Sequence, residues 1–166
     1  LNPHFIFNAL NSIRALVDEN PVKSKNAITQ LSNILRNSLT VDRQRLVTFS
    51  EEMEMVRDYL ALDTIRYEER LRIEVNIDPK ATEYLIPPLM VQTLVENGIK
   101  HGISTLKNGG KVEISSKVDN ENLFIQIRNT GQYLNGETKK KSGFGLNNTK
   151  KRLELIYGDQ ASFRIL

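Results

Sequence analysis

The 166 residues contain only two histidines, and each stands among side chains that could bind or react. The first, His4, lies in the opening stretch LNPHFIFNALN. Apolar residues recur there at the spacing of one helical face, at Ile6, Leu10, Ile13 and Val17. His4, Asn8 and Asn11 fall on the opposite face, so the pattern predicts an exposed histidine on the polar side of a helix.

The second histidine, His101, closes the stretch VENGIKHG. On a helix, Asn97, Lys100 and His101 lie within one turn. A carboxamide oxygen suits Mg²⁺, which binds a few protein oxygens together with water and phosphate, and a lysine beside it can neutralise phosphate charge. Glu96 lies about 100° around the helix from Asn97 and is the weaker candidate ligand. The alternative is an ordinary helix end whose polar residues are solvated.

Two glycine-containing segments add to these candidates. Gly143-Phe144-Gly145 precedes a helical pattern, where backbone amides can reach phosphate oxygens at a helix N-terminus. Asn129-Thr130-Gly131 ends a strand pattern, where a side-chain oxygen can face a base and the glycine lets the base approach. Taken alone, the first segment can equally be a loop-to-helix turn, and the second a turn that ends a strand.

Two helices must position the first histidine. Asn2-Pro3 and Asn20-Pro21 each combine a favoured N-cap residue with proline at the first helical position, so each predicts a helix start. The second helix carries its own apolar stripe, at Ile28, Leu31, Leu35 and Leu39. Two such helices cannot bury both stripes alone, which favours a four-helix bundle made by two copies of the chain.

The remainder of the chain predicts an α/β sandwich in which helices cover one face of a sheet. A polar, irregular segment over 41–50 separates it from the two helices, and Thr48 and Glu51 have capping-box spacing at the start of the next helix. The further elements predicted are a strand over 71–77, a helix over 89–102, a hairpin of strands over 111–118 and 123–129 around Asp119-Asn120, a helix ending near residue 156 and a strand over 162–166.

The composition excludes several classes of protein. The formal net charge is only +3, from 23 Lys and Arg against 20 Asp and Glu, so we expect no nucleic-acid partner. The absence of cysteine rules out disulfides, thiolate metal sites and a cysteine nucleophile. No apolar run approaches the roughly 20 residues of a membrane helix. The chain lacks an initial methionine and ends inside a strand pattern, so we expect a fragment whose parent protein supplies any membrane contact.

Together, these clusters resemble the sensor histidine kinases of the LytS/YehU-like group, which carry a GHKL-type ATP-binding domain. The matching stretches are N-P-H-F-I-F-N at 2–8, I-P-P-L at 86–89, V-E-N-G-I-K-H-G at 95–102 and G-F-G-L-N-N at 143–148, with Arg152-Leu153 beyond. The resemblance implies an α+β fold, with a dimerising helical hairpin over 1–46 and a GHKL-type α/β sandwich over 47–166. It also implies the cytoplasmic portion of an inner-membrane sensor protein.

The resemblance further implies roles for individual residues. His4 would be the phosphoacceptor that attacks the γ-phosphate of ATP, and the phosphoryl group would then pass to an aspartate of a response-regulator receiver domain. Asn97 would hold Mg²⁺, with Lys100 and His101 along the phosphates. The other nucleotide-binding positions that it implies are Asn129, Gly131, Gly143, Gly145 and Asn148.

Three positions depart from the family pattern. Asn129 stands where many relatives have an aspartate that accepts the adenine amino hydrogen, which predicts a lower affinity for adenine. Tyr133 stands where a second glycine is often found. Phe5 follows the histidine where many histidine kinases have an acid, so we predict that Asn8, one helical turn on, accepts a hydrogen bond from Nδ1–H and orients the ring. A neutral imidazole carries its own lone pair at pH 7 and needs a base less than a serine hydroxyl does.

Two other functions stay open from the sequence. A GHKL-type ATPase would want a carboxylate base one turn before Asn97, where this chain has Thr93, and it would leave His4 without a role. A catalytically degenerate, nucleotide-binding dimeric scaffold is consistent with Asn129 and Tyr133.

Overall fold

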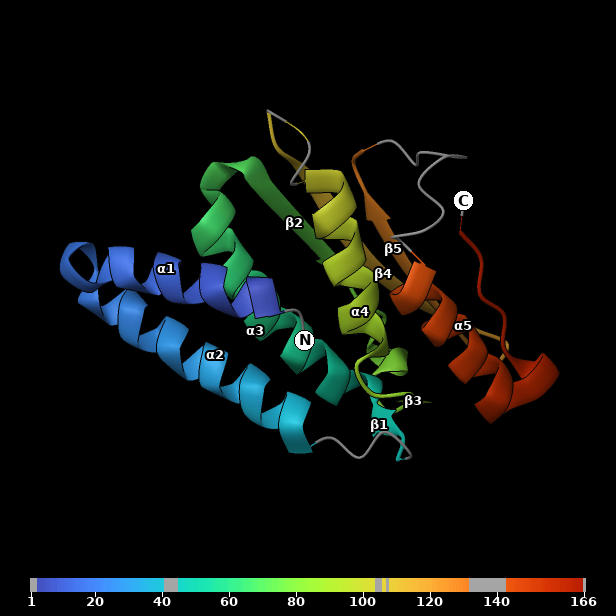
Figure 1. Ribbon diagram of the computed structural model, residues 1–166. Helices are drawn as coiled ribbons and strands as arrows, with labels where there is room; N and C mark the ends of the chain where they lie inside the picture. The colour runs from blue at the N-terminus through green and yellow to red at the C-terminus, as the bar shows by residue number, and fades with distance from the viewer. Residues whose placement is uncertain (1–2, 41–44, 104–105, 107, 132–142, 166) are drawn as a thin grey trace.

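The computed structural model describes residues 3–40, 45–103, 106, 108–131 and 143–165 (Figure 1). It is a mixed structure of helices and strands, in which two long N-terminal helices lie beside a unit where helices pack on a sheet. No helix in the described part of the chain is long and apolar enough to cross a membrane.

The two N-terminal helices are α1, Pro3–Glu19, and α2, Pro21–Thr40. Asn20 caps α2, because its side-chain oxygen accepts a hydrogen bond from the backbone N–H of Lys23 at 3.0 Å. This confirms the helix start predicted from the second Asn-Pro pair. Asn2, in the first pair, lies outside the described residues.

The rows of side chains that α1 and α2 bury within one chain differ from the apolar stripes read from the sequence. In α1 the buried residues are Phe5, Ala9 and Ile13, and in α2 they are Ser24, Ala27, Leu31 and Ile34. Both helices contact α3, so each turns one row toward that helix. Leu10 and Val17 of the predicted stripe are therefore half exposed, and Leu39 is 85% exposed.

Helix α3, Phe49–Tyr67, runs through the middle of the molecule. The predicted capping box is confirmed, because the backbone N–H of Glu51 donates to the Thr48 hydroxyl at 3.2 Å and the Glu51 carboxylate accepts from the Thr48 N–H at 2.8 Å. The buried side of α3 carries Met53, Val56 and Leu60.

A three-stranded sheet holds the C-terminal unit together. Its strands are β2, Leu71–Asn76, β4, Gly110–Asp119, and β5, Asn122–Asn129, in the spatial order β2-β4-β5. Strand β2 is parallel to β4, and β4 is antiparallel to β5. Val112 and Ile114 of β4 are fully buried against the helices. A separate two-stranded pair joins β1, Val47–Thr48, to β3, Leu85–Ile86.

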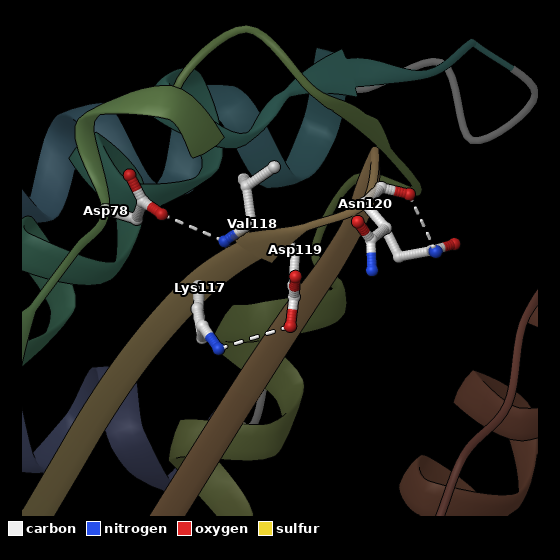
Figure 2. A network of polar contacts seen from close by, with 6 residues as sticks. Asp78, Lys117, Val118, Asp119 and Asn120 are labelled. Atoms are coloured by element: carbon white, nitrogen blue, oxygen red, sulfur yellow. Dashed lines mark hydrogen bonds and ion pairs between the residues drawn. The ribbon is translucent and has the colours of Figure 1, made fainter.

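The predicted β-hairpin is confirmed between β4 and β5. Asn120 and Glu121 form its two-residue turn, with φ of 47° and 63°, the left-handed values of the turn type that matches strand twist. Figure 2 shows how Asp78 fastens the strand next to this turn: its carboxylate accepts from the backbone N–H of Val118 at 2.9 Å. On the same strand, Lys117 and Asp119 form an exposed ion pair at 3.3 Å.

The last helices are α4, Met90–Gly98, and α5, Gly143–Tyr157. A π-helical turn, Ile99–Ile103, continues α4, and short 3₁₀ turns span Glu68–Arg70, Pro79–Ala81 and Gly158–Gln160. The strand predicted over 162–166 is wrong for the described residues 162–165, which form neither helix nor strand. Alternating side chains predict which way residues would face, but a strand also needs a hydrogen-bonding neighbour.

Candidate functional site

His4 lies in the first turn of α1, and its side chain is exposed, as the helical spacing predicted. The amide of Asn8 lies against the ring, where its nitrogen donates to Nδ1 of His4 at 2.9 Å. We had expected the amide oxygen at this contact. If Nδ1 is the acceptor, a neutral ring carries its proton on Nε2. If the amide is turned over, its oxygen accepts from Nδ1–H instead, and the ring is then the other tautomer.

Phe5, the residue after His4, is a packing anchor. Its ring stacks on Tyr59 of α3 with centroids 4.6 Å apart and an interplanar angle of 23°, and only 6% of its surface is exposed. Because successive helical residues point about 100° apart, burying Phe5 against α3 turns His4 away from that contact. An aromatic side chain thus fixes the helix at the position where the resemblance would place an acid in many histidine kinases.

Two carboxyl groups lie close to this aromatic pair, Asp63, which is buried, and Glu96, which is half-buried. Burial raises the pKa of Asp63 on α3 to about 6, while a hydrogen bond from Tyr59 and the charge of Arg66 lower it. Burial also raises the pKa of Glu96 on α4, whose carboxylate accepts from the side chain of Gln92 at 2.8 Å. Among the described residues, no donor reaches Oδ2 of Asp63. A charged Asp63 is therefore costly to the fold.

This cost predicts a specific pH dependence of stability. The folded-state pKa of Asp63 lies above its ordinary value of 3.8, so the fold loses stability as the pH rises from about 4 to about 6. The shift corresponds to about 3 kcal/mol at most. We expect Asp63→Asn to raise the free energy of unfolding at pH 7.5 by about 1–2 kcal/mol and to flatten its decline between pH 4 and 6. Urea unfolding across this pH range measures both effects.

The exposed Asp18→Asn variant is the control for this measurement, because it removes one carboxylate without touching the buried cluster. A variant at Asp63 that is less stable than the parent at pH 7.5, or that keeps the full decline, would contradict the prediction.

Asn97 lies half-buried in the last turn of α4, and Lys100 is exposed in the π-helical turn that follows. We had predicted one α-helix through Gly102, which would align Asn97 with His101; the wider π turn, in which hydrogen bonds span five residues, changes that alignment. His101 belongs to this turn, and its side chain lies outside the described residues. The turn brings Gly102 against β5, where a Cβ would overlap the Thr130 carbonyl oxygen.

The end of β5, where we predict that Asn129 faces the adenine base, lies against α4. A Cβ at Gly98 would lie 3.4 Å from Oδ1 of Asn129, so this oxygen faces the backbone of α4. The amide nitrogen of Asn129 donates to the Thr130 carbonyl oxygen at 3.2 Å. Gly131 follows, exposed and with a φ of 137°, which favours glycine.

The glycine turn, Gly143-Phe144-Gly145, also lies next to α4. Gly143 and Gly145 form the first turn of α5 rather than a loop before it. A Cβ at Gly145 would lie 3.2 Å from both Nδ2 of Asn97 and Cγ2 of Thr93, so the glycine lets the start of α5 approach the Asn97 side chain. Asn148 is exposed one turn further along. Tyr133 and the lysines at 139–141 lie outside the described residues.

The structure thus brings together Asn97, the end of β5 and the first turn of α5. The sequence reasoning missed Glu52 and Asp63, two acids of α3 that are each only 2% exposed. The spacing contained a signal for them, because Glu52 and Asp63 lie on one helical face with Val56 and Tyr59. Read that way, the stripe predicts buried carboxyl groups.

Several known proteins are similar to this chain in sequence. Residues 1–71 match the histidine kinase family. Over 176 aligned residues, covering 99% of this chain, the sequence is 34% identical to the sensor histidine kinase/phosphatase LytS of Staphylococcus aureus. Over 173 residues it is 32% identical to the sensor protein LytS of Staphylococcus haemolyticus. The chain spans about 30% of the length of these curated relatives.

These matches show what the chain is similar to. Its first 71 residues match the histidine kinase family. Along nearly its whole length the chain is similar to the LytS sensor kinases, which confirms the resemblance drawn from the sequence.

Proposed function

We propose that the chain is the catalytic core of a two-component sensor histidine kinase, which transfers the γ-phosphoryl group of ATP to His4. The observation that carries the proposal is the convergence of Asn97, Asn129 and Gly145 around one helix, in a chain that also exposes a histidine at its first helical turn. The identity with sensor histidine kinases over 99% of the chain supports the same activity.

We also propose an assignment of the two structural units to known domain types. Strands β2, β4 and β5 with helices α3, α4 and α5 would form the GHKL-type ATP-binding domain over 47–166, and α1 with α2 the helical hairpin over 1–46. The order of the segments supports it, because the helix with Asn97 precedes the strand that ends at Asn129, and the glycine turn follows.

The residues around α4 fit magnesium and a nucleotide. The carboxamide of Asn97 would hold Mg²⁺, which would neutralise phosphate charge when bound. Exposed Lys100 adds a positive charge beyond the same helix end, and His101 would lie with it along the phosphates. Asn129 and Gly131 would face the base, while Gly143, Gly145 and Asn148 would lie at the phosphates, where the first-turn amides of α5 favour anions.

The reaction would be an in-line phosphoryl transfer. A lone-pair nitrogen of the His4 ring forms the P–N bond, the bond from the γ-phosphorus to the bridging oxygen breaks, and ADP leaves with that electron pair. The ring proton then passes to solvent. The phosphoryl group would next be transferred to an aspartate of a response-regulator receiver domain, the partner typical of the family.

The exposed apolar side chains of α1 and α2 support a homodimer. One chain leaves Phe7 67% exposed, Val22 70% and Leu39 85%. A second hairpin packed against these side chains would complete a four-helix bundle. We also propose that the segment is the cytoplasmic portion of a membrane-bound sensor, with membrane contact made only by other segments of the parent protein.

Incubation of the chain with γ-labelled ATP and Mg²⁺ tests the proposed function. An acid-labile label on the protein supports the kinase. Release of phosphate without protein label would instead favour the ATPase, and nucleotide binding with neither would favour the scaffold. Thr93 stands where the ATPase would need its carboxylate, and its hydroxyl donates to the Leu89 carbonyl oxygen at 2.6 Å, so we favour the kinase.

The contact between Asn8 and His4 predicts a change in rate. When the Asn8 amide presents its oxygen to Nδ1–H, it keeps the proton on Nδ1 and leaves the lone pair of Nε2 for the attack. Asn8→Ala removes this hydrogen bond, so we expect autophosphorylation to slow about tenfold, as for the loss of one hydrogen bond of about 1.4 kcal/mol. The affinity for ATP should stay the same, since Asn8 belongs to α1. Single-turnover labelling at saturating ATP measures the rate, with the exposed Asn11→Ala as control. An unchanged rate in Asn8→Ala would remove this residue from the mechanism.

A further inference from the structure

Glu52 is a buried acid that the proposed chemistry does not use. It lies in the first turn of α3, is 2% exposed, and reaches across to the start of α4. Its Oε2 accepts from the backbone N–H of Leu89 at 2.8 Å, and its Oε1 accepts from the backbone N–H of Gln92 at 3.1 Å. Burial raises the pKa of this carboxyl, while the N–H groups at the start of α4 and the charge of Arg152 lower it.

The first backbone N–H groups of α4 need hydrogen-bond acceptors, and the Glu52 carboxylate provides them. The N-cap residue is Leu89, whose side chain has no hydrogen-bonding group and whose φ of 61° lies in the left-handed region. The first N–H groups of a helix lack partners inside the helix, and leaving them buried and unpaired is costly. Glu52 supplies, from another helix, the cap that Leu89 cannot provide.

Arg152 of α5 holds the same point from the opposite side. Its guanidinium donates to the Pro88 carbonyl oxygen at 2.7 Å, directly before the residue that Glu52 binds. Helices α3, α4 and α5 therefore meet at Pro88 and Leu89 through two charged side chains. The three helices lie next to one another in Figure 1, with α4 between the other two.

The placement of the first turn of α4 affects the placement of Asn97 in its last turn. Asn97 and Thr93 both lie beside Gly145, so the face of α4 that meets α5 runs from the start of the helix to its last turn. Thr93 is in turn bonded back to the Leu89 carbonyl oxygen. A shift or twist of the first turn would move Asn97 relative to the glycine turn.

We propose that Glu52 and Arg152 are positioning residues that set α4 against α5 and so hold Asn97 at the glycine turn. The inference rests on the proposed nucleotide site, and it adds two residues outside that site to the determinants of nucleotide affinity. Neither needs to touch the nucleotide, because both act through the backbone of residues 88–92.

Two variants of the whole chain test this proposal, Glu52→Gln and Arg152→Met. We expect the amides of Leu89, Val91 and Gln92 to exchange with deuterium about tenfold faster in Glu52→Gln, because an amide presents only one acceptor oxygen to these donors. The dissociation constant for ADP with Mg²⁺ should rise about tenfold in each variant, and the double variant should lose less than the product of the two effects.

Glu51→Gln is the matched control, since the neighbouring exposed acid caps its own helix α3 and does not reach α4. It should lower the melting temperature but leave ADP affinity within twofold and exchange in α4 unchanged. Unaltered exchange and affinity in both Glu52→Gln and Arg152→Met would overturn the inference. If the parent chain binds no ADP, the proposed function fails. Amide exchange at the start of α4 in the two variants still tests whether Glu52 and Arg152 position this helix.

Discussion

We expect the chain with His4→Gln to carry no acid-labile phosphoryl group after incubation with ATP and Mg²⁺, while its affinity for ATP should stay within twofold of the parent. This is the largest effect that we expect from a single substitution. Glutamine keeps a polar side chain in the first turn of α1 but has no lone-pair nitrogen that can form the P–N bond. Because His4 is exposed and its neighbour Phe5 carries the packing, the substitution should leave the fold intact.

The other histidine is the natural control for this experiment. His101→Gln should retain label at His4, at a reduced level that higher ATP concentrations restore, since His101 belongs to the proposed phosphate side of the site. The chemical stability of the label identifies a phosphohistidine, because this phosphoramidate is lost in acid and survives base. Label that persists in His4→Gln would show that another residue is the phosphoacceptor.

The second large effect is the loss of magnesium-dependent nucleotide binding in Asn97→Ala. Asn97 is the one carboxamide at the meeting point of α4 with Gly145 that we assign to the metal. Removing this oxygen ligand should weaken ATP binding about a hundredfold, which corresponds to about 2.7 kcal/mol, and should abolish labelling of His4. The alanine is smaller than the asparagine, so it meets no steric obstacle from the start of α5.

Titration of ATP with and without EDTA separates a metal ligand from a structural residue. The parent chain should bind ATP more weakly when EDTA removes Mg²⁺. Asn97→Ala should bind ATP as weakly as the EDTA-treated parent does, and EDTA should not lower its affinity further. Asn97→Asp keeps a hard oxygen ligand and should recover part of the magnesium response. Asn147→Ala, exposed on α5, is the control. A full magnesium response in Asn97→Ala would exclude Asn97 as the ligand.

Short-range features of the fold were predictable from the sequence because they depend on residues a few positions apart. The cap at Asn20, the capping box of Thr48 and Glu51, and the hairpin between β4 and β5 all form as expected. In each case the hydrogen bonds join residues whose spacing is visible in the sequence. The helical face of His4 could be predicted for the same reason.

Features that depend on distant residues could not be predicted. The cap of α4 comes from Glu52, 37 positions before Leu89, and nothing near Leu89 signals it. The π turn after Gly98 brings Gly102 against Thr130, a contact set by the path of β5. The family resemblance supplied the candidate nucleotide residues, but only the structure placed Asn97 next to Gly145.

The stacked pair of Phe5 and Tyr59 has a consequence for how a signal could reach His4. Rotating α1 about its axis by one residue, about 100°, would carry His4 toward α3 and expose Phe5 to water. Fully exposing a buried phenylalanine side chain costs about 1.5–3 kcal/mol, the same range as a typical coupling free energy between two sites. The pair therefore stabilises the observed orientation of α1 by a free energy of about this size, and any rotation that turns His4 toward α3 would have to supply it.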